Sequence, residues 1–202
     1  MKTLADLNRE IFLCQDCALA KTRNIAVPGE GSEDAEIMLI GEAPGFYEDK
    51  QGKPFVGSAG KFLDELLQSI GLDRTKVYIC NVIKCRPPDN RDPFPQEIES
   101  CRKWLDLQIE IISPKVIVTL GRHSMAKFFR GASIGKIHGT AQEINGRLCF
   151  AMYHPAAALH QQNLRKTIEA DILKLPGIMA HYGEAAKLEM QAEPEPEQLS
   201  LF

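Results

Sequence analysis

Four short apolar runs along the chain predict buried β-strands. Each run is rich in Val, Ile, Leu, Met or aromatic residues, and none alternates strictly with polar residues. This pattern is typical of strands in a sheet that is covered on both faces. The predicted strands are Glu36–Gly41, Val77–Ile83, Lys115–Leu120 and Leu148–Tyr153.

Amphipathic stretches between and beyond these strands predict helices. Ala59–Ile70 places its apolar residues on one stripe and stops at Gly71, and Pro95–Ile112 has a proline in its first turn. Leu164–Ile172 repeats an apolar residue every four positions. Strands alternating with helices predict an α/β protein, a three-layer α/β/α sandwich with a central, mainly parallel four-stranded sheet. Ligands of such sheets bind beyond the carboxyl ends of the strands.

Composition places the chain among ordinary globular proteins. It has 202 residues, of which 44% are hydrophobic and 25% are charged, which excludes a disordered, collagenous or coiled-coil chain. No apolar run approaches the ~20 residues that span a bilayer. The N-terminal segment carries charges where a secretory signal needs an apolar stretch. We therefore expect a cytoplasmic protein without membrane contact, and we expect a monomer.

The formal net charge of −3 is unevenly distributed. Residues 184–202 contain five Glu and one Lys, so the other residues hold 23 Lys and Arg against 22 Asp and Glu. A nucleic-acid-binding face would therefore be a local patch on a neutral body. We predict a single domain over residues 1–183 and a flexible acidic tail over 184–202, which ends in a short apolar cluster.

Four of the six cysteines are spaced like metal ligands. Cys14 and Cys17 form a Cys-x-x-Cys pair, and Cys85 and Cys101 form a looser second pair. Four soft thiolate ligands suit zinc or an iron–sulfur cluster, and spacing alone does not separate the two. The alternative is that these residues are small core side chains. The other two, Cys80 and Cys149, lie inside apolar strands and are predicted to be core residues.

Polar residues follow three of the predicted strands. The glycine-rich segment Gly41–Gly60 follows the first, and it is neither a Walker loop nor a dinucleotide-binding fingerprint. Asn81 is a lone amide within the second strand, and His154 follows the fourth. The plain structural alternatives are a turn, a hydrogen-bonded buried amide and a core histidine.

Together these segments resemble motifs of the uracil-DNA glycosylase superfamily. The similar segments are GEAPG and GKPFVGSAG, the Asn81 strand with KCRPP, and HPAAAL. The four cysteines resemble those of its iron–sulfur branch, called family 4, and the resemblance runs from Cys14 to Asp171. It implies the fold of that superfamily and a [4Fe–4S] cluster on Cys14, Cys17, Cys85 and Cys101. It also implies excision of uracil from single- or double-stranded DNA, which leaves an abasic site for base excision repair.

The resemblance also assigns a uracil pocket. Phe55 is similar to a residue that stacks on the flipped base, and Asn81 to one whose amide matches the O4 and N3–H edge of uracil but not that of cytosine. His154 is similar to the donor that stabilises the uracil anion at O2. Backbone N–H groups from Gly41 to Ala43 are expected to assist.

The resemblance assigns Glu42 to the catalytic water, and Glu48 and Asn90 remain alternatives for that role. Glu48 has a second alternative role, the exclusion of thymine near uracil C5. Three basic residues near Cys85 could meet DNA phosphates, with a solvated basic loop as the alternative. Leu159 could enter the space that the flipped base leaves, with core packing as the alternative. The basic residues are Lys84, Arg86 and Arg91.

Two further features refine the prediction. The loop KCRPPDNRDP lacks the histidine of a covalent-trapping branch of the superfamily, so permanent attachment to uracil DNA is not expected. Gln198–Phe202 (QLSLF) resembles the short peptide that docks on the bacterial sliding clamp, with a frayed tail as the alternative. Competing functions are a non-catalytic iron–sulfur module that senses damaged DNA and a glycosylase for another deaminated base, such as hypoxanthine.

Overall fold

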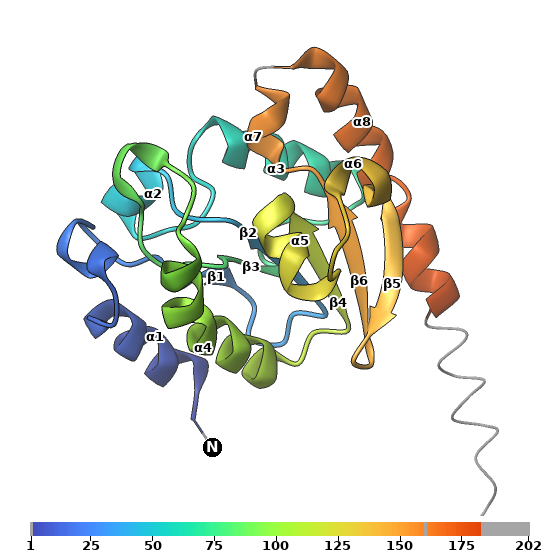
Figure 1. Ribbon diagram of the computed structural model, residues 1–202. Helices are drawn as coiled ribbons and strands as arrows, with labels where there is room; N and C mark the ends of the chain where they lie inside the picture. The colour runs from blue at the N-terminus through green and yellow to red at the C-terminus, as the bar shows by residue number, and fades with distance from the viewer. Residues whose placement is uncertain (1, 160, 183–202) are drawn as a thin grey trace, which may run out of the picture.

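A six-stranded sheet organises the protein in the computed structural model, which describes residues 2–159 and 161–182 (Figure 1). The predicted tail and its clamp-like peptide Gln198–Phe202 lie outside the described residues. The strand order is β1-β3-β2-β4-β6-β5, and the four inner strands run parallel. Their bounds are β2 Ile37–Gly41, β3 Val77–Asn81, β4 Val116–Leu120 and β6 Arg147–Met152.

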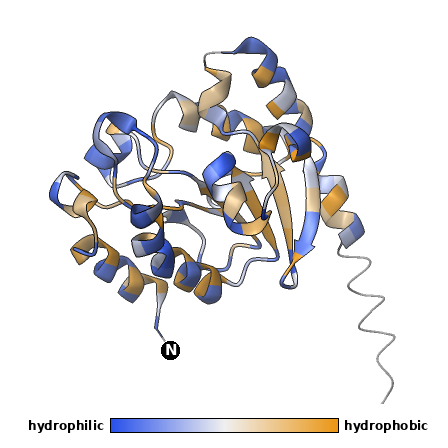
Figure 2. Cartoon of the chain, viewed as in Figure 1, coloured by the Kyte–Doolittle hydropathy of each residue, from blue (hydrophilic) through white to orange (hydrophobic). Residues whose placement is uncertain are grey.

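All four predicted strands are confirmed, but the predicted number of strands is wrong. Two antiparallel strands, β1 (Glu30–Gly31) and β5 (Thr140–Ile144), add one strand to each edge. β1 spans only two residues and β5 is mostly polar, so neither produces an apolar run in the sequence. In Figure 2 the inner strand β6 is coloured as hydrophobic, whereas the edge strand β5 is largely hydrophilic.

Helices cover both faces of the sheet, as the three-layer prediction requires. Alternate residues of β2 show the division: Met38 and Ile40 pack in one core with α1, α4 and α5, while Ile37 and Leu39 pack in the other with α3, α7 and α8. The helices are α1 Leu4–Leu13, α2 Phe46–Gln51, α3 Ser58–Ser69, α4 Pro95–Ile112, α5 Arg122–Phe128, α6 Ile134–Ile137, α7 Pro155–Ala158 and α8 Gln162–Ile172. Two 3₁₀ turns, Ala18–Lys21 and Pro88–Asn90, lie in the connections.

Local sequence signals explain where the helices begin and end. The Thr3 hydroxyl accepts the backbone N–H of Asp6, and the Asp6 carboxylate accepts that of Thr3, a capping box at the start of α1. Pro95 occupies the first turn of α4, where its missing N–H costs nothing. The chain leaves α3 through Gly71, whose φ of 75° is a left-handed conformation that glycine adopts freely.

The strand order places the chemistry of the protein at one edge. β2 lies at the centre, with β3 on one side and β4 on the other, so the connections that leave β2 and β3 run in opposite directions. In open α/β sheets a crevice for ligands forms at this kind of position, beyond the carboxyl ends of the strands. No helix among the described residues is long and apolar enough to cross a membrane.

Candidate active site and metal centre

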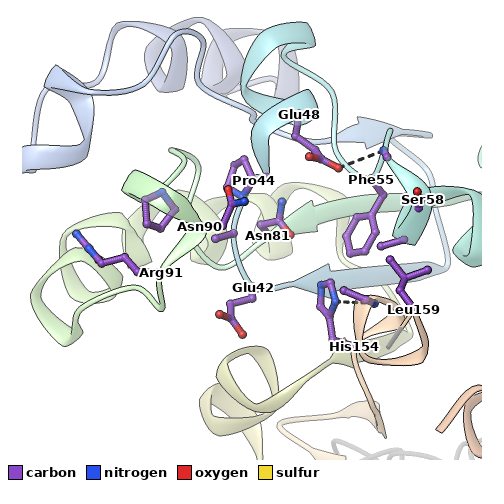
Figure 3. A pocket seen from close by; sticks show the side chains of 16 residues that line it. Glu42, Pro44, Glu48, Phe55, Ser58, Asn81, Asn90, Arg91, His154 and Leu159 are labelled. Carbon is purple, nitrogen blue, oxygen red and sulfur yellow. Dashed lines mark hydrogen bonds between the residues drawn. The ribbon is translucent and has the colours of Figure 1, made fainter. Parts of the chain in front are cut away.

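A cavity of about 520 Å³ opens at the carboxyl edge of the parallel strands (Figure 3). Glu42 follows β2, Asn81 ends β3, and His154 follows β6. All three line this cavity together with Ala43 and Phe55. The structure therefore brings together side chains that lie more than 100 positions apart in the sequence, as the strand-end argument predicts.

Gly41 allows Asn81 and Phe55 to approach the backbone at the end of β2. A methyl group built on Gly41 would lie 2.3 Å from Asn81 Oδ1 and 2.7 Å from Cζ of Phe55. Both distances are well inside van der Waals contact, so any other residue would displace the amide and the ring. By having no side chain, Gly41 thus makes room for Asn81 and Phe55, which both line the cavity.

The Asn81 side chain is only 2% exposed, and its Oδ1 has no hydrogen-bond partner among the described residues. An unsatisfied buried polar atom costs ~1–3 kcal/mol. The backbone of this residue is anchored, because the Lys84 ammonium donates to the Asn81 carbonyl over 2.8 Å. A buried acceptor without a partner, on a residue that lines a cavity, indicates a binding site in which the ligand supplies the hydrogen-bond donor.

Phe55 stands in a strained backbone conformation, with φ at 52° in the left-handed region. Arg74 donates to the carbonyl groups of Pro54 and Phe55, and Glu48 Oε1 accepts the Val56 N–H over 3.1 Å. These bonds hold the loop on both sides of the ring. Strain held in this way concentrates at functional sites, and here it turns the Phe55 ring toward the cavity.

His154 stacks on Phe55, with ring centroids 5.4 Å apart and planes at 24°. Its Nδ1 accepts the backbone N–H of Ala156 over 3.1 Å, so the proton of the neutral ring resides on Nε2. Burial lowers the pKa of His154 from 6.5 to about 4. The residue is therefore a neutral N–H donor at physiological pH.

Glu42 lies in a network of charges that the sequence prediction missed. Its Oε1 is 3.7 Å from His123 Nε2, which is 3.8 Å from Asp92 Oδ1, and Arg122 forms an ion pair with Asp92. Burial raises the pKa of Glu42, and the charge of His123 opposes that rise. Arg122 and His123 directly follow the end of β4, so the strand-end argument could have found them had it been applied to the third predicted strand.

The atoms of Glu42, Asp92 and His123 that could hold a cation lie within 4.8 Å of one another. Arg122 already neutralises Asp92, however. The group is better described as a charge network around Glu42.

The two alternatives to Glu42 are both engaged by the protein. Besides its bond to Val56, Glu48 Oε1 lies 3.4 Å from the Gly57 N–H. Asn90 Oδ1 accepts a hydrogen bond from Arg86 Nε over 2.7 Å. Both residues line the cavity, but one side-chain oxygen of each already accepts a hydrogen bond from another residue of the protein.

One predicted DNA contact is wrong. Lys84 is 1% exposed and donates to Asn81 and to Gln108 Oε1, so it braces the core and does not reach a phosphate. Arg91 lines the cavity and pairs with Glu97. Leu159 also lines the cavity and is 46% exposed at its rim.

The four predicted ligand cysteines come together in a second, small cavity. They are contributed by the C-terminal end of α1, the following loop, the loop after β3, and α4, and they are Cys14, Cys17, Cys85 and Cys101. All are free thiols, and burial raises the pKa of Cys85 and Cys101. Cys80 and Cys149 are fully buried in the sheet, as predicted for core residues.

N–H groups point at three of these sulfurs. Arg23 donates to Cys85 Sγ over 3.0 Å, Trp104 Nε1 to Cys14 Sγ over 3.3 Å, and the Lys84 backbone to Cys101 Sγ over 3.2 Å. Such bonds favour the thiolate, which is the form that binds metal. The residues therefore fit a thiolate-bound metal group.

Comparisons with known proteins agree with this geometry. The uracil DNA glycosylase superfamily matches residues 28–174 of the chain. A type-4 uracil-DNA glycosylase of Sulfurisphaera tokodaii is 47% identical over 187 residues, which cover 87% of this chain and 84% of that protein. One from Archaeoglobus fulgidus is 48% identical over 184 residues, which cover 87% and 92%. A type-5 uracil-DNA glycosylase of Thermus thermophilus is 32% identical over 149 residues, which cover 63% and 68%.

Proposed function

Since the chain belongs to the uracil-DNA glycosylase superfamily, in its type-4 branch, we propose that it hydrolyses the N-glycosidic bond of deoxyuridine flipped out of DNA. The products are free uracil and an abasic site, the substrate of base excision repair. One observation carries the proposal: Asn81, whose buried Oδ1 has no partner among the described residues, shares a cavity with the Phe55–His154 stack. Extruding a base costs a few kcal/mol, part of which stacking on Phe55 recovers.

Asn81 reads the base. Uracil presents the O4 acceptor next to the N3–H donor, and a side-chain amide offers NH₂ to the first and its carbonyl to the second. The buried Oδ1 without a partner supports this role, because uracil N3–H supplies the donor that it lacks. Cytosine reverses both groups and would leave two buried polar atoms unpaired, at a cost of several kcal/mol.

His154 stabilises the leaving group. When the bond from N1 to C1′ breaks, electrons move onto uracil and the sugar gains oxocarbenium character. The Nε2–H of His154 donates to uracil O2, where charge accumulates only in the transition state. A neutral ring suffices, because uracil leaves as an anion that needs a hydrogen bond and not a full proton. We expect backbone N–H groups of Gly41 to Ala43 to assist.

Glu42 positions the water that adds to C1′ and accepts its proton. Figure 3 shows the His154 ring beside Phe55, and Glu42 on the other side of His154. We favour Glu42 over Glu48 and Asn90, because Glu48 Oε1 already accepts the Val56 N–H and Asn90 Oδ1 already accepts a hydrogen bond from Arg86. Leu159, exposed at the rim, is our candidate for the residue that enters the gap left in the DNA.

We further propose that Cys14, Cys17, Cys85 and Cys101 hold a [4Fe–4S] cluster. Four thiolates suit zinc as well as an iron–sulfur cluster. The similarity of the chain to type-4 uracil-DNA glycosylases, whose branch the four cysteines resemble, supports the cluster. Through these four cysteines, a bound cluster would connect the end of α1 to α4 and to the loop that follows Asn81.

An oligonucleotide assay tests the activity. A labelled single strand with one uracil is incubated with cluster-loaded protein, then cleaved with alkali at abasic sites. Strand breaks at the uracil are expected, and matched oligonucleotides with cytosine, thymine or hypoxanthine should stay intact. No break at equimolar protein would leave the non-catalytic damage-sensing module as the function. Breaks at hypoxanthine alone would indicate the other deaminated-base enzyme.

Metal analysis tests the cofactor separately. Purified protein is expected to contain iron and acid-labile sulfide and to absorb visible light. Stoichiometric zinc in a colourless preparation would contradict the cluster assignment and leave the glycosylase proposal standing.

The cellular setting is also a proposal. We place the enzyme in the cytoplasm, where the reducing environment keeps cysteines free. We also propose that it is a monomer. Gln198–Phe202, outside the described residues, would recruit it to the sliding clamp. A clamp pull-down should lose its signal when Leu201 and Phe202 are deleted.

A further inference from the structure

Three exposed aromatic rings border the uracil cavity. We call Phe46, Tyr47 and Phe94 the aromatic rim; they are 43%, 59% and 54% exposed. Exposing large rings forfeits the stabilisation that burying them would give. Rings left in solvent beside a cavity therefore need an explanation in terms of binding.

Two of the rings adjoin residues that line the cavity, and the third packs against one of these rings. A methyl group built on Gly57, which lines the cavity, would lie 3.7 Å from Cδ2 of Tyr47. Phe46 packs edge-on against Tyr47, with centroids 5.4 Å apart. Arg91, another lining residue, places its guanidinium 3.7 Å from the centre of the Phe94 ring.

Positive charges accompany the rings. Lys50 Nζ lies 4.3 Å from the centre of the Phe46 ring and the Arg86 guanidinium 5.2 Å from it. Aromatic faces for bases combined with cations for phosphates are the recognition elements of single-stranded nucleic acid. The rim and these cations thus match a strand whose bases are unpaired, on a protein body that is otherwise near neutral.

We propose that the aromatic rim stacks the bases that flank the extruded uracil in single-stranded DNA. This rests on the proposed function and names the substrate form that the site prefers. In a duplex the neighbouring bases are already paired and stacked on each other, so their faces are unavailable. In a single strand they can turn onto the rim while Lys50 and Arg86 meet the phosphates.

Binding measurements test the proposal apart from catalysis. The probe is a dye-labelled nine-nucleotide single strand with central 2′-fluoro-2′-deoxyuridine, which resists cleavage because fluorine disfavours positive charge at C1′. It is compared with a probe whose flanking nucleotides lack bases, and with a duplex. The proteins are the cluster-loaded wild type, the double variant F46A/Y47A, and the control L173A, which removes an exposed leucine from the end of α8.

The double variant should bind the single strand about 5- to 150-fold more weakly per stacked base lost. Wild-type protein should lose a similar factor when the flanking bases are removed, and the double variant should then lose little more. The duplex should be affected much less, and L173A should match the wild type throughout.

Three results would overturn the proposal: equal affinities of F46A/Y47A and L173A for the single strand, an undiminished flanking-base effect in the double variant, or equal losses on single strand and duplex. The wild-type comparison of the two single-stranded probes needs no substitution, so it stands even if the double variant is misfolded. If the wild type releases no uracil in the alkali assay, the proposed function itself fails, which is a different outcome.

Discussion

The neutral state of His154 gives the sharpest prediction about mechanism. Each pKa unit corresponds to ~1.4 kcal/mol, so a pKa of about 4 in place of 6.5 makes protonation of His154 cost roughly 3 kcal/mol more in the folded protein than in the unfolded chain. At pH 6.5 an ordinary histidine is half protonated, whereas here roughly one molecule in 300 is. Catalysis should therefore not depend on titration of His154 between pH 5 and 8.

The perturbation is the pair of variants His154→Ala and His154→Gln. Loss of a donor to a developing anion typically costs 10²–10³-fold in rate, so His154→Ala should lose about that much. The glutamine variant should retain more activity, because it keeps an N–H donor. The assay is single-turnover uracil release at saturating DNA across pH 4.5–8.5, with iron content and circular dichroism as controls of the fold.

Wild type and His154→Gln should show pH–rate profiles of the same shape, with any acid limb due to Glu42. An inflection between pH 6 and 7 in the wild type that disappears in His154→Gln would refute this reasoning, since it would make the imidazolium the catalytic form. The free energy of unfolding should also depend on this proton. Between pH 6.5 and about 4 the unfolded chain binds it and the folded protein does not, so the free energy of unfolding falls as the pH falls through that window.

Three further outcomes are expected. Gly41→Ala should abolish detectable uracil binding in equilibrium dialysis, because its methyl group would lie 2.3 Å from Asn81 Oδ1; retained affinity would contradict the role of Gly41 in making room for Asn81. Asn81→Asp should lower the preference for uracil over cytosine at least tenfold in competitive excision, since a carboxylate lacks the donor for O4; unchanged selectivity would remove Asn81 from base reading. His123→Gln should move the acid limb of the rate profile to higher pH, because the pKa of Glu42 loses the charge that opposes its rise; an unmoved limb would separate His123 from Glu42.

Much of the fold could be predicted from the sequence because the inner strands are buried on both faces and therefore consist of apolar runs. β2 and β4 face helices on both sides, so every position is apolar or small and the run is visible. β5 belongs to an edge and packs on one side, so its polar residues conceal it. The length of a strand is also hidden: the predicted Val77–Ile83 ends at Asn81 in the structure.

The candidate site divides in the same way. Asn81 and His154 stood out because a polar residue at the end of an apolar strand is conspicuous. The predicted pocket residues line one cavity, except Gly41, which lies against two of them. The strand-end argument could have reached His123, in the first turn of α5 after β4, but its approach to Asp92, in the loop before α4, is a contact that no local pattern encodes. The prediction for Lys84 was wrong for a related reason: only the fold reveals that its ammonium group donates a hydrogen bond to Gln108 Oε1.

The conformation of Phe55 has a consequence for how lesions are found. Arg74 and Glu48 already lock the loop in its left-handed turn, so no ordering is required when a base arrives. A repair protein must sample a vast excess of normal nucleotides for each lesion. A preorganised pocket discriminates against a base that does not fit without first having to change conformation. If Phe55 stacks on the base as we propose, the strain held at this residue would shorten each encounter with a normal nucleotide.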